Sequence, residues 1–235
     1  MKKTLFSLAA LTATLFITSS CVIERRHAQD GTISEGLDVL TVAVPNFTSI
    51  DAWGAVQVHY TPGPLDSVRV EGDPEDIARF EVKVDGDELN VGPSSSMYVG
   101  RSSRRTTVVY IQAPNVGEFD ISGASSLDIT APYTTSRLDV DVSGASHFSA
   151  PSVVCTRASF DASGASGIDC SLDSTSFIEA GASGASNVSL NLNRCGGIDC
   201  SASGASGISI SGTVNNVSLE SSGASRVHDN TQKWQ

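Results

Sequence analysis

The chain has 235 residues, with 26 acidic and 15 basic side chains and a formal net charge of −11 at pH 7. A surface of this sign repels nucleic acids and anionic lipid headgroups, which argues against a protein that binds either. Aromatic residues make up 6% of the sequence and glycine occurs 21 times. This composition favours a β-rich stack with tight turns over a helical bundle.

The N-terminal segment predicts an export signal. Lys2 and Lys3 precede an apolar run over residues 5–17, which is too short to span a bilayer as a helix of about 20 residues. Small residues directly before Cys21 resemble the lipobox of bacterial lipoproteins, in which this cysteine becomes the lipidated first residue of the mature chain. We therefore predict an outer-membrane lipoprotein, periplasmic or surface-exposed, with simple secretion as the alternative.

The region that follows alternates apolar and polar residues over short segments. These segments are SVRVEG, FEVKV, ELNVG and TTVVYIQAP, separated by turn sequences such as Gly72-Asp73-Pro74 and Asp85-Gly86. Alternation with a period of two predicts half-buried strands. Only residues 74–80, PEDIARF, predict a short helix.

The segment over residues 94–107 interrupts this rhythm. It places an aromatic, a methionine and three arginines on an otherwise acidic chain: Met97, Tyr98, Arg101, Arg104 and Arg105. Aromatic and arginine side chains are enriched where proteins make contacts. We predict that this loop binds a partner, with a merely solvated loop as the alternative.

The C-terminal half repeats the tetrapeptide Ser-Gly-Ala-Ser. The word begins at Ser122, Ser143, Ser163, Ser183, Ser203 and Ser222. A period of about 20 residues is typical of a solenoid, in which each repeat buries its apolar face only by stacking on its neighbours. Residues 50–60, IDAWGAVQVHY, align with residues 160–170, FDASGASGIDC, and we interpret them as a degenerate seventh copy.

The residues around each Ser-Gly-Ala-Ser word alternate in polarity. Apolar residues lie three and five positions before the first serine and five and seven positions after it, as Phe160 and Ile168 do around Ser163. Such alternation laid over a period of 20 predicts strands stacked in register as a parallel β-solenoid, with rungs about 4.8 Å apart. Glycine lets the chain turn a tight corner; whether the alanine or the second serine points inward is left open by the spacing.

Four features together resemble a known bacterial family. They are the lipidated leader, a Phe47-x-x-Ile50 entry into a strand, the Gly72-Asp73-Pro74 turn and the Ser-Gly-Ala-Ser rungs. Over residues 40–228 the chain resembles the putative auto-transporter adhesin, head GIN domain family. The resemblance implies an exported protein with a right-handed parallel β-helix fold and no catalytic motif.

The predicted organisation is one all-β domain with two short segments before it and one after it. The segments are a lipoprotein signal peptide over residues 1–20, a tether over 21–39, a β-solenoid over 40–229 and a tail over 230–235, with irregular rungs over 40–117 and regular rungs over 118–229. Rungs of 20 residues leave little room for the loops that wall a substrate cleft.

Four cysteines follow Cys21 in a chain predicted to enter an oxidising compartment. Cys170 and Cys200 occupy apolar slots of the repeat and are predicted to act as small core residues. Cys155 and Cys195 lie two rungs apart, nearly 10 Å, which is too far for a disulfide. A pairing of Cys195 with Cys200 remains open.

The outward positions beside the apolar slots form an acidic ladder that includes Asp120, Asp141 and Asp161. Stacking brings like charges within about 5 Å, which is unfavourable unless water or cations intervene. We predict a solvated face, with calcium bound between the carboxylates as a speculative alternative. No cofactor and no other metal site are predicted.

The repeat argues against a single catalytic centre, because six equivalent serines cannot all be the one activated by a base. The leading hypothesis is a non-enzymatic, adhesin-like module of the cell envelope that binds an unknown carbohydrate, matrix or protein partner. This module is predicted to contact the membrane through its lipid anchor only and to bind no nucleic acid. Self-association through unpaired end rungs is a further option. The alternatives are a carbohydrate-active enzyme on a β-helix and a structural envelope protein without a discrete ligand.

Overall fold

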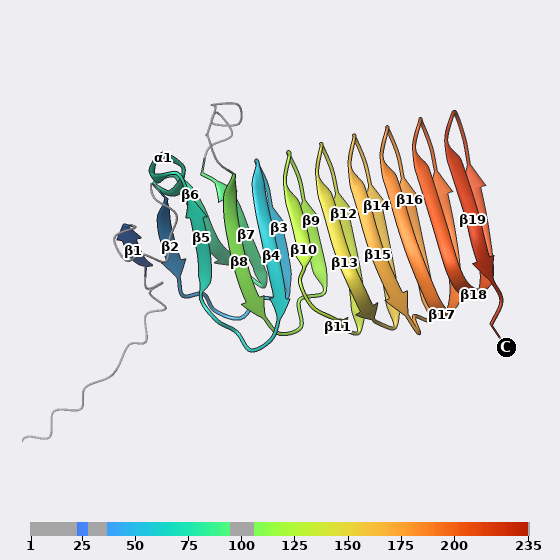
Figure 1. The fold of residues 1–235 in the computed structure, drawn as a ribbon, viewed down its shortest axis with the longest axis horizontal. Coiled ribbons are helices and arrows are strands. Elements are labelled where there is room, and N and C mark those ends of the chain that lie inside the picture. The colour runs from blue at the N-terminus through green and yellow to red at the C-terminus, as the bar shows by residue number, and fades with distance from the viewer. Residues whose placement is uncertain (1–22, 28–36, 95–105, 235) are drawn as a thin grey trace, which may run out of the picture.

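The structure, a computed structural model, describes residues 23–27, 37–94 and 106–234. It is a rod of stacked β-strands that begins at β1 (Ile23–His27) and ends at β19 (Arg226–Gln232), with these two strands at opposite ends (Figure 1). The all-β solenoid with rungs of about 20 residues is confirmed. In the described part of the chain, no helix is long and apolar enough to cross a membrane.

Each regular rung contributes one strand before its Gly-Ala-Ser corner and one after it. The strands before the corners form the first parallel sheet: β3 (Ser49–Ala52), β9 (Glu118–Ile121), β12 (Arg137–Val142), β14 (Arg157–Ala162), β16 (Phe177–Ala182) and the second parts of β17 (Asn187–Ala202) and β18 (Gly207–Ser221). The strands after the corners form the second parallel sheet: β4 (Val56–Pro62), β10 (Ser126–Ile129), β13 (His147–Val154), β15 (Gly167–Asp173), the first parts of β17 and β18, and β19. The two-residue β11 (Tyr133–Thr134) pairs with the end of β13.

The glycine of each corner has a conformation that other residues rarely adopt. In the six Ser-Gly-Ala-Ser copies its φ lies between +72° and +79°. A Cβ on Gly164 would also lie 2.6 Å from the carbonyl oxygen of Gly144 in the preceding rung. Glycine is therefore required both by backbone conformation and by the close stacking of the corners.

The second serine of the corner points inward and the alanine points outward. Ser125, Ser146, Ser166, Ser186 and Ser206 are 0 to 4% exposed, whereas the alanines are exposed. The Ser186 hydroxyl lies 2.8 Å from the carbonyl oxygen of Ser183 in its own rung and 2.9 Å from that of Ala162 in the rung before. The inward serines thus join successive rungs, because a buried hydroxyl needs a partner.

The apolar slots of the repeat form one continuous core, as predicted. Phe119, Phe148 and Phe160 are each 0% exposed, and the rings of Tyr60, Phe119 and Phe148 follow one another with centroids 5.6 Å apart. Burial of a side chain of this size contributes roughly 1.5–3 kcal/mol. Each rung therefore adds its own apolar side chains to this core.

Residues 50–60 do form the seventh copy. Gly54 has a φ of +96°, and a Cβ on Gly123 would lie 2.4 Å from the Gly54 carbonyl oxygen. Trp53 stands in the place of the first serine of the word, and its indole N–H donates to the Pro93 carbonyl oxygen at 3.1 Å.

The N-terminal part differs from the irregular parallel rungs expected there, because several of its strands are antiparallel. β2 (Asp38–Val42) pairs antiparallel with β1 and with β5 (Val68–Gly72), and β5 pairs antiparallel with β8 (Thr107–Ala113). β6 (Phe80–Asp85) and β7 (Glu88–Pro93) form a hairpin. The alternation of apolar residues is the same in both kinds of pairing, and only the tight Asp85-Gly86 turn distinguishes them, since parallel strands need a longer connection.

These antiparallel strands and α1 (Pro74–Ile77) form the N-terminal cap of the rod. Ile77 is 2% exposed, so the short helix predicted from PEDIARF packs on the core. β1 lies in the stretch assigned as a tether, and β19 continues to Gln232 in the stretch assigned as a tail.

Candidate functional site

The outer face of the first sheet carries a column of four aspartates. Asp51 pairs in register with Asp120, Asp120 with Asp141, and Asp141 with Asp161. Strands in one sheet lie about 4.8 Å apart, so each carboxyl group stands within a Debye length of its neighbour in the column, about 8 Å at physiological salt.

This stacking alters the acidity of the column. The pKa of Asp120 is raised to about 6, first by burial and then by the charges of Asp141 and Asp51. The pKa values of Asp51 and Asp141 are also raised, mainly by burial. The outer face of the first sheet therefore repels anions, and its aspartates bind their protons more tightly than isolated aspartates do.

A second acidic row on the same face contains Glu118, Asp139, Glu179 and Asp199. Asp139 forms an ion pair with Arg137 through Oδ2, while its buried Oδ1 has no hydrogen-bond partner. Among the described residues, no group of three or more carboxylate, histidine or cysteine side chains could hold a metal ion. The calcium hypothesis for the aspartate column therefore gains no support from the geometry.

The outer face of the second sheet carries a different set of side chains near the N-terminal cap. Arg69 of β5, Tyr110 of β8 and His59 of β4 are neighbours in register. The Arg69 guanidinium lies 5.4 Å from the centroid of the Tyr110 ring, and the centroids of the His59 and Tyr110 rings are 5.5 Å apart. Tyr110 is 37% exposed. We call these three residues the Arg–Tyr–His ladder.

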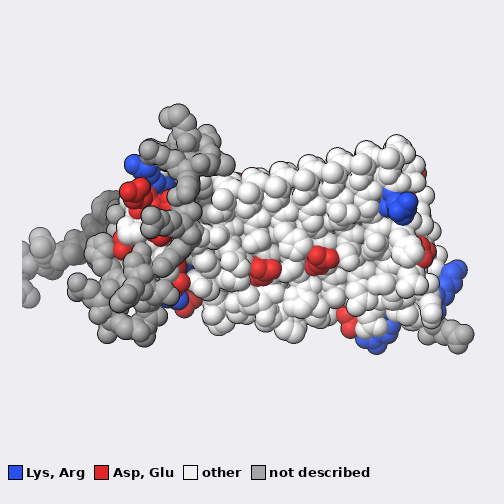
Figure 2. All heavy atoms as spheres, turned by 45° about the horizontal axis from the view of Figure 1, so that its top comes forward, with Lys and Arg blue, Asp and Glu red and all other residues white. Residues whose placement is uncertain are grey.

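The row continues from this ladder along the rod with hydrogen-bonding groups. His59 Nδ1 lies 3.9 Å from Asp128 Oδ2, and Ser149 donates to the other oxygen of Asp128. Asp169 lies two rungs beyond Asp128 in this row, and its Oδ2 lies 3.5 Å from Nε2 of His147 on β13. Figure 2 shows one side of the rod as regular ridges that are largely uncharged, with acidic side chains placed singly along them.

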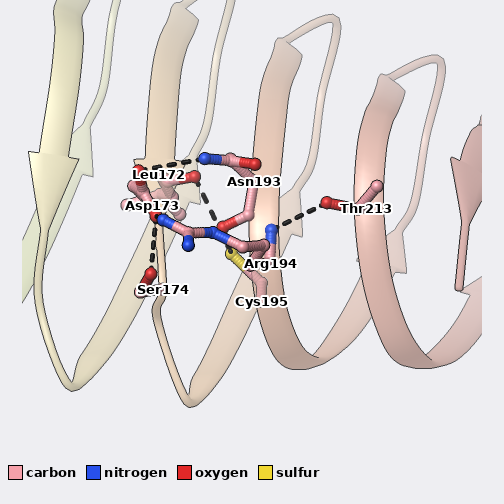
Figure 3. A network of polar contacts seen from close by, with 7 residues as sticks. All are labelled: Leu172, Asp173, Ser174, Asn193, Arg194, Cys195 and Thr213. Carbon is pink, nitrogen blue, oxygen red and sulfur yellow. Dashed lines mark hydrogen bonds and ion pairs between the residues drawn. The ribbon is translucent and has the colours of Figure 1, made fainter. Parts of the chain in front are cut away.

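The corners opposite the Gly-Ala-Ser words are held by a polar network (Figure 3). Asp173 accepts hydrogen bonds from Ser174 at 2.6 Å, Asn193 at 3.0 Å and Arg194 at 3.2 Å. These contacts, above all the one from Ser174, lower the pKa of Asp173. The Arg194 backbone N–H donates to Thr213 at 2.7 Å in the next rung, so the network joins three rungs and has a structural role.

The cysteines belong to the core. Cys155, Cys170, Cys195 and Cys200 are free and buried, and burial raises their pKa values, that of Cys200 to about 12. Cys195 lies at the corner between the two parts of β17 and Cys200 in its second part, and the two are separate free thiols. Thr175 lies between the rungs of Cys155 and Cys195, 3.5 Å from the Cys155 sulfur.

The sequence-predicted site residues fall partly outside the described chain. Cys21 and the predicted loop residues Met97, Tyr98, Arg101, Arg104 and Arg105 lie outside the described residues. The described ends of that loop are β7 and β8, and the latter carries Tyr110. The Arg–Tyr–His ladder was missed by the sequence reading, although alternation in TTVVYIQAP already places Tyr110 at an outward position.

The inward serines have no catalytic arrangement. Each hydroxyl from Ser166 to Ser225 is directed at backbone carbonyl oxygens of its own and the preceding rung. A groove of about 260 Å³ on the first face, between Asp141 and Ser203, is lined mainly by small residues. Its lining brings no histidine or lysine, the usual activating bases, next to a serine.

The fold recurs in solved structures at low sequence identity. A putative adhesin from Bacteroides fragilis matches with a TM-score of 0.68 and 19% identity, over 83% of this chain and 97% of that chain. A putative adhesin from Parabacteroides distasonis matches with a TM-score of 0.58 and 12% identity, over 83% and 95%. One from Parabacteroides merdae has a TM-score of 0.50 and 12% identity, over 85% and 98%. At these identities the likeness shows the fold.

Family membership follows from the sequence match rather than from the shape of the rod. Among curated proteins, none matches the chain. The family model described as putative auto-transporter adhesin, head GIN domain, matches residues 46–177, which span the seventh copy and the first three Ser-Gly-Ala-Ser rungs. This chain therefore belongs to the putative auto-transporter adhesin, head GIN domain family.

Proposed function

We propose that this chain is a non-enzymatic, adhesin-like binding module, anchored in the cell envelope through lipidated Cys21. Its family supports an adhesin-like role in the envelope or outside the cell. The proposed ligand is a carbohydrate, matrix or protein surface.

One observation carries this proposal: outward positions repeat along the rod instead of converging. Asp51, Asp120, Asp141 and Asp161 stand at one equivalent position in four successive strands. An active site needs unlike groups, such as a nucleophile, a base and an orienting residue, directed at one point. Repeated rows suit weak contacts whose affinities combine through multivalency.

The strongest single contacts are proposed at the N-terminal end of the second sheet. There the Arg–Tyr–His ladder exposes a tyrosine beside an arginine, two residue types that dominate binding hot spots. The loop over residues 94–107 joins β7 to β8 and adds Tyr98 and three arginines to the same part of the sequence. We therefore assign the ladder and this loop as one binding element.

The test compares binding of the chain to arrays of glycans and matrix proteins before and after two changes. Replacing residues 97–105 by a Gly-Ser linker and, separately, Tyr110→Ala should each weaken binding at least tenfold while the melting temperature stays the same. Val154→Ala is the matched control, because Val154 is 39% exposed on the same sheet and lies outside the element. Unchanged binding in both variants would contradict the assignment.

Two further outcomes decide between the alternatives. Glycan cleavage that Asp161→Asn abolishes would establish a carbohydrate-active enzyme, and binding to no ligand would leave a structural envelope protein. The anchor is tested separately: Cys21→Ser should move the protein from the membrane fraction to the soluble fraction, and unchanged membrane association would contradict lipidation at this cysteine.

A further inference from the structure

The two ends of the rod are built differently. The N-terminal cap covers the core there, with Ile77 2% and Phe47 3% exposed. The other end, which consists of β18 and β19, is not covered in this way. Leu219 of β18, one of the four large apolar side chains that are exposed in the described part of the chain, is 43% exposed. Trp234, which follows β19, is 40% exposed, and its indole N–H donates to the Cys195 carbonyl oxygen at 2.8 Å.

This end presents two strand edges, one from each sheet. β18 pairs with β17 along nearly its whole length. On its other side, only residues 207–213 pair, and they pair with β19. Within the described chain, residues 214–221 and β19 have no further strand beside them. We call these two segments the open end. Unpaired backbone N–H and C=O groups along such edges can pair with another chain.

The rows of the core also stop at the open end. Leu219 continues the row of Ala180 and Cys200, which are buried, but it is itself exposed. Val217 and Val227 continue two other rows and are only partly buried. The open end therefore combines unpaired backbone with an apolar surface that the next rung would cover.

The charge of the open end differs from that of the rest of the chain. The charged residues of the open end are Glu220, Asp229 and Arg226, a net charge of −1, with Lys233 directly after β19, whereas the whole chain carries −11. Two copies brought side by side would face each other with acidic rows. Two copies brought end to end would not meet that repulsion.

We propose that the open end binds the open end of a second copy of this chain, forming an end-to-end dimer. A twofold axis perpendicular to the sheets would place residues 214–221 antiparallel to the same residues of the second copy, and β19 antiparallel to β19. The open end has two strand edges, one from each sheet, about 10 Å apart. Another rung of the same kind has two edges at the same spacing, whereas a single extended peptide would pair with only one edge.

The size of the interface sets the expected affinity. Strands of seven residues are about 23 Å long, and two sheets with their outer side chains are about 20 Å thick, so pairing buries roughly 900 Å² in total. This value lies near the lower limit of about 1,000 Å² for specific interfaces. The dimer should therefore be weak and reversible, with a dissociation constant in the micromolar range.

Asp229 limits how the open end can be used. It stands in the row of Ile210 and Leu190, which point into the core, and accepts hydrogen bonds from the Thr231 backbone N–H at 2.9 Å and hydroxyl at 2.7 Å. A charge directed inward at an edge weakens the pairing of any strand placed beside it, including β19 of the second copy, so residues 214–221 supply most of the stabilisation of the dimer. Isologous pairing also uses both edges of each copy, so the assembly closes at two chains.

The orientation of the rod gives the dimer a consequence for adhesion. Because β1 and β19 lie at opposite ends (Figure 1), a chain anchored at its N-terminus would present the open end away from the membrane. Pairing would then join rods from two opposing surfaces. This consequence rests on the proposed anchoring, whereas the pairing itself does not.

The experiment is sedimentation velocity of the full chain from 1 to 300 μM, in a Cys21→Ser background so that lipid cannot drive association. The wild-type end should give a concentration-dependent dimer. Leu219→Lys should raise the dissociation constant at least tenfold, because it places like charges opposite each other in an apolar contact. Val154→Lys is the matched control, with a valine 39% exposed far from the open end, and should leave the dimer intact.

Two additional measurements keep the test decisive. Small-angle scattering should show that the long dimension of the particle about doubles in the dimer. If Leu219→Lys fails to fold, Ser218→Glu replaces it, and dimer weakening by this variant should be reversed at high salt. Three results would overturn the proposal: a monomer at every concentration, a dimer no longer than the monomer, or equal effects of the Leu219 and Val154 variants. Binding of a strand from a different protein to the open end would also overturn it.

Discussion

The inward serines offer the sharpest test of how the rungs are held together. Ser186 is 0% exposed, and its hydroxyl lies within 2.9 Å of two carbonyl oxygens, one in its own rung and one in the preceding rung. Ser186→Ala removes this hydroxyl and leaves a side chain of nearly the same volume. The change therefore measures a hydrogen bond and creates no cavity.

The expected loss of stability follows from the acceptors that remain. A buried group left without its hydrogen bond costs about 1–3 kcal/mol. The Ala162 carbonyl oxygen keeps one donor, because it also accepts the Ser183 backbone N–H at 2.8 Å. We therefore expect Ser186→Ala to lower the free energy of unfolding by about 1–2 kcal/mol, or the melting temperature by about 2–8 °C for a domain of this size.

Two other serines serve as controls in thermal or denaturant unfolding followed by circular dichroism. Ser183 is the outward serine of the same word, and Ser183→Ala should change stability by less than about 0.5 kcal/mol. Ser225 makes the same contacts as Ser186 but is only partly buried, so water can replace them and Ser225→Ala should cost less. Equal effects of Ser183→Ala and Ser186→Ala would refute the role assigned to the inward serine.

Three further predictions follow from burial, charge and backbone conformation. Ile168→Asp, at a side chain 1% exposed, should cost about 3–5 kcal/mol by leaving a buried charge unpaired, whereas Asp161→Ser should be near neutral; equal melting temperatures would reverse the inward and outward assignments. The folded-state pKa of Asp120 is raised from 3.8 to about 6, so the contribution of Asp120 to stability is lost as pH rises from about 4 to 6. Asp120→Asn should therefore stabilise the protein at pH 7 by about 1 kcal/mol after solvent screening. A difference in unfolding free energy between wild type and Asp120→Asn that stays constant from pH 4 to 7 would contradict the raised pKa. Gly164→Ala should cost more than Gly86→Ala in unfolding experiments, because both have positive φ but a Cβ meets backbone only at Gly164; equal costs would show that conformation alone matters.

The period of the sequence was sufficient to predict the stack of rungs. Ile168 and Phe160 recur at fixed distances from the Gly-Ala-Ser word, and a side chain that recurs in register must meet its equivalent in the next rung. The direction of the two corner residues could not be predicted, because alternation holds only while the chain is extended. At the corner the choice depends on the carbonyl oxygens that surround Ser186, and one of them, that of Ala162, comes from the preceding rung.

The N-terminal cap and the Arg–Tyr–His ladder were harder to predict for a related reason. Arg69, Tyr110 and His59 come from β5, β8 and β4, where antiparallel and parallel pairing meet. The sequence shows that each residue points outward, but the order of the strands decides which ones are neighbours. A fixed period supplies that order in the regular rungs and supplies nothing in the cap.

Departures from the repeat therefore add information about function that the repeat itself does not supply. A rung that continues the stack needs an apolar residue in the row of Ile210, and Asp229 there weakens the packing of any rung that followed it. A carboxylate in this apolar row is destabilising unless the row ends there and water or Thr231 can solvate the charge. Leu219, on the other sheet of the same end, keeps its apolar character although nothing in the described chain buries it. One half of the open end thus resists the addition of a rung while the other half favours burial, so in the proposed pair the contact between residues 214–221 stabilises the dimer and the contact between the two β19 strands opposes it.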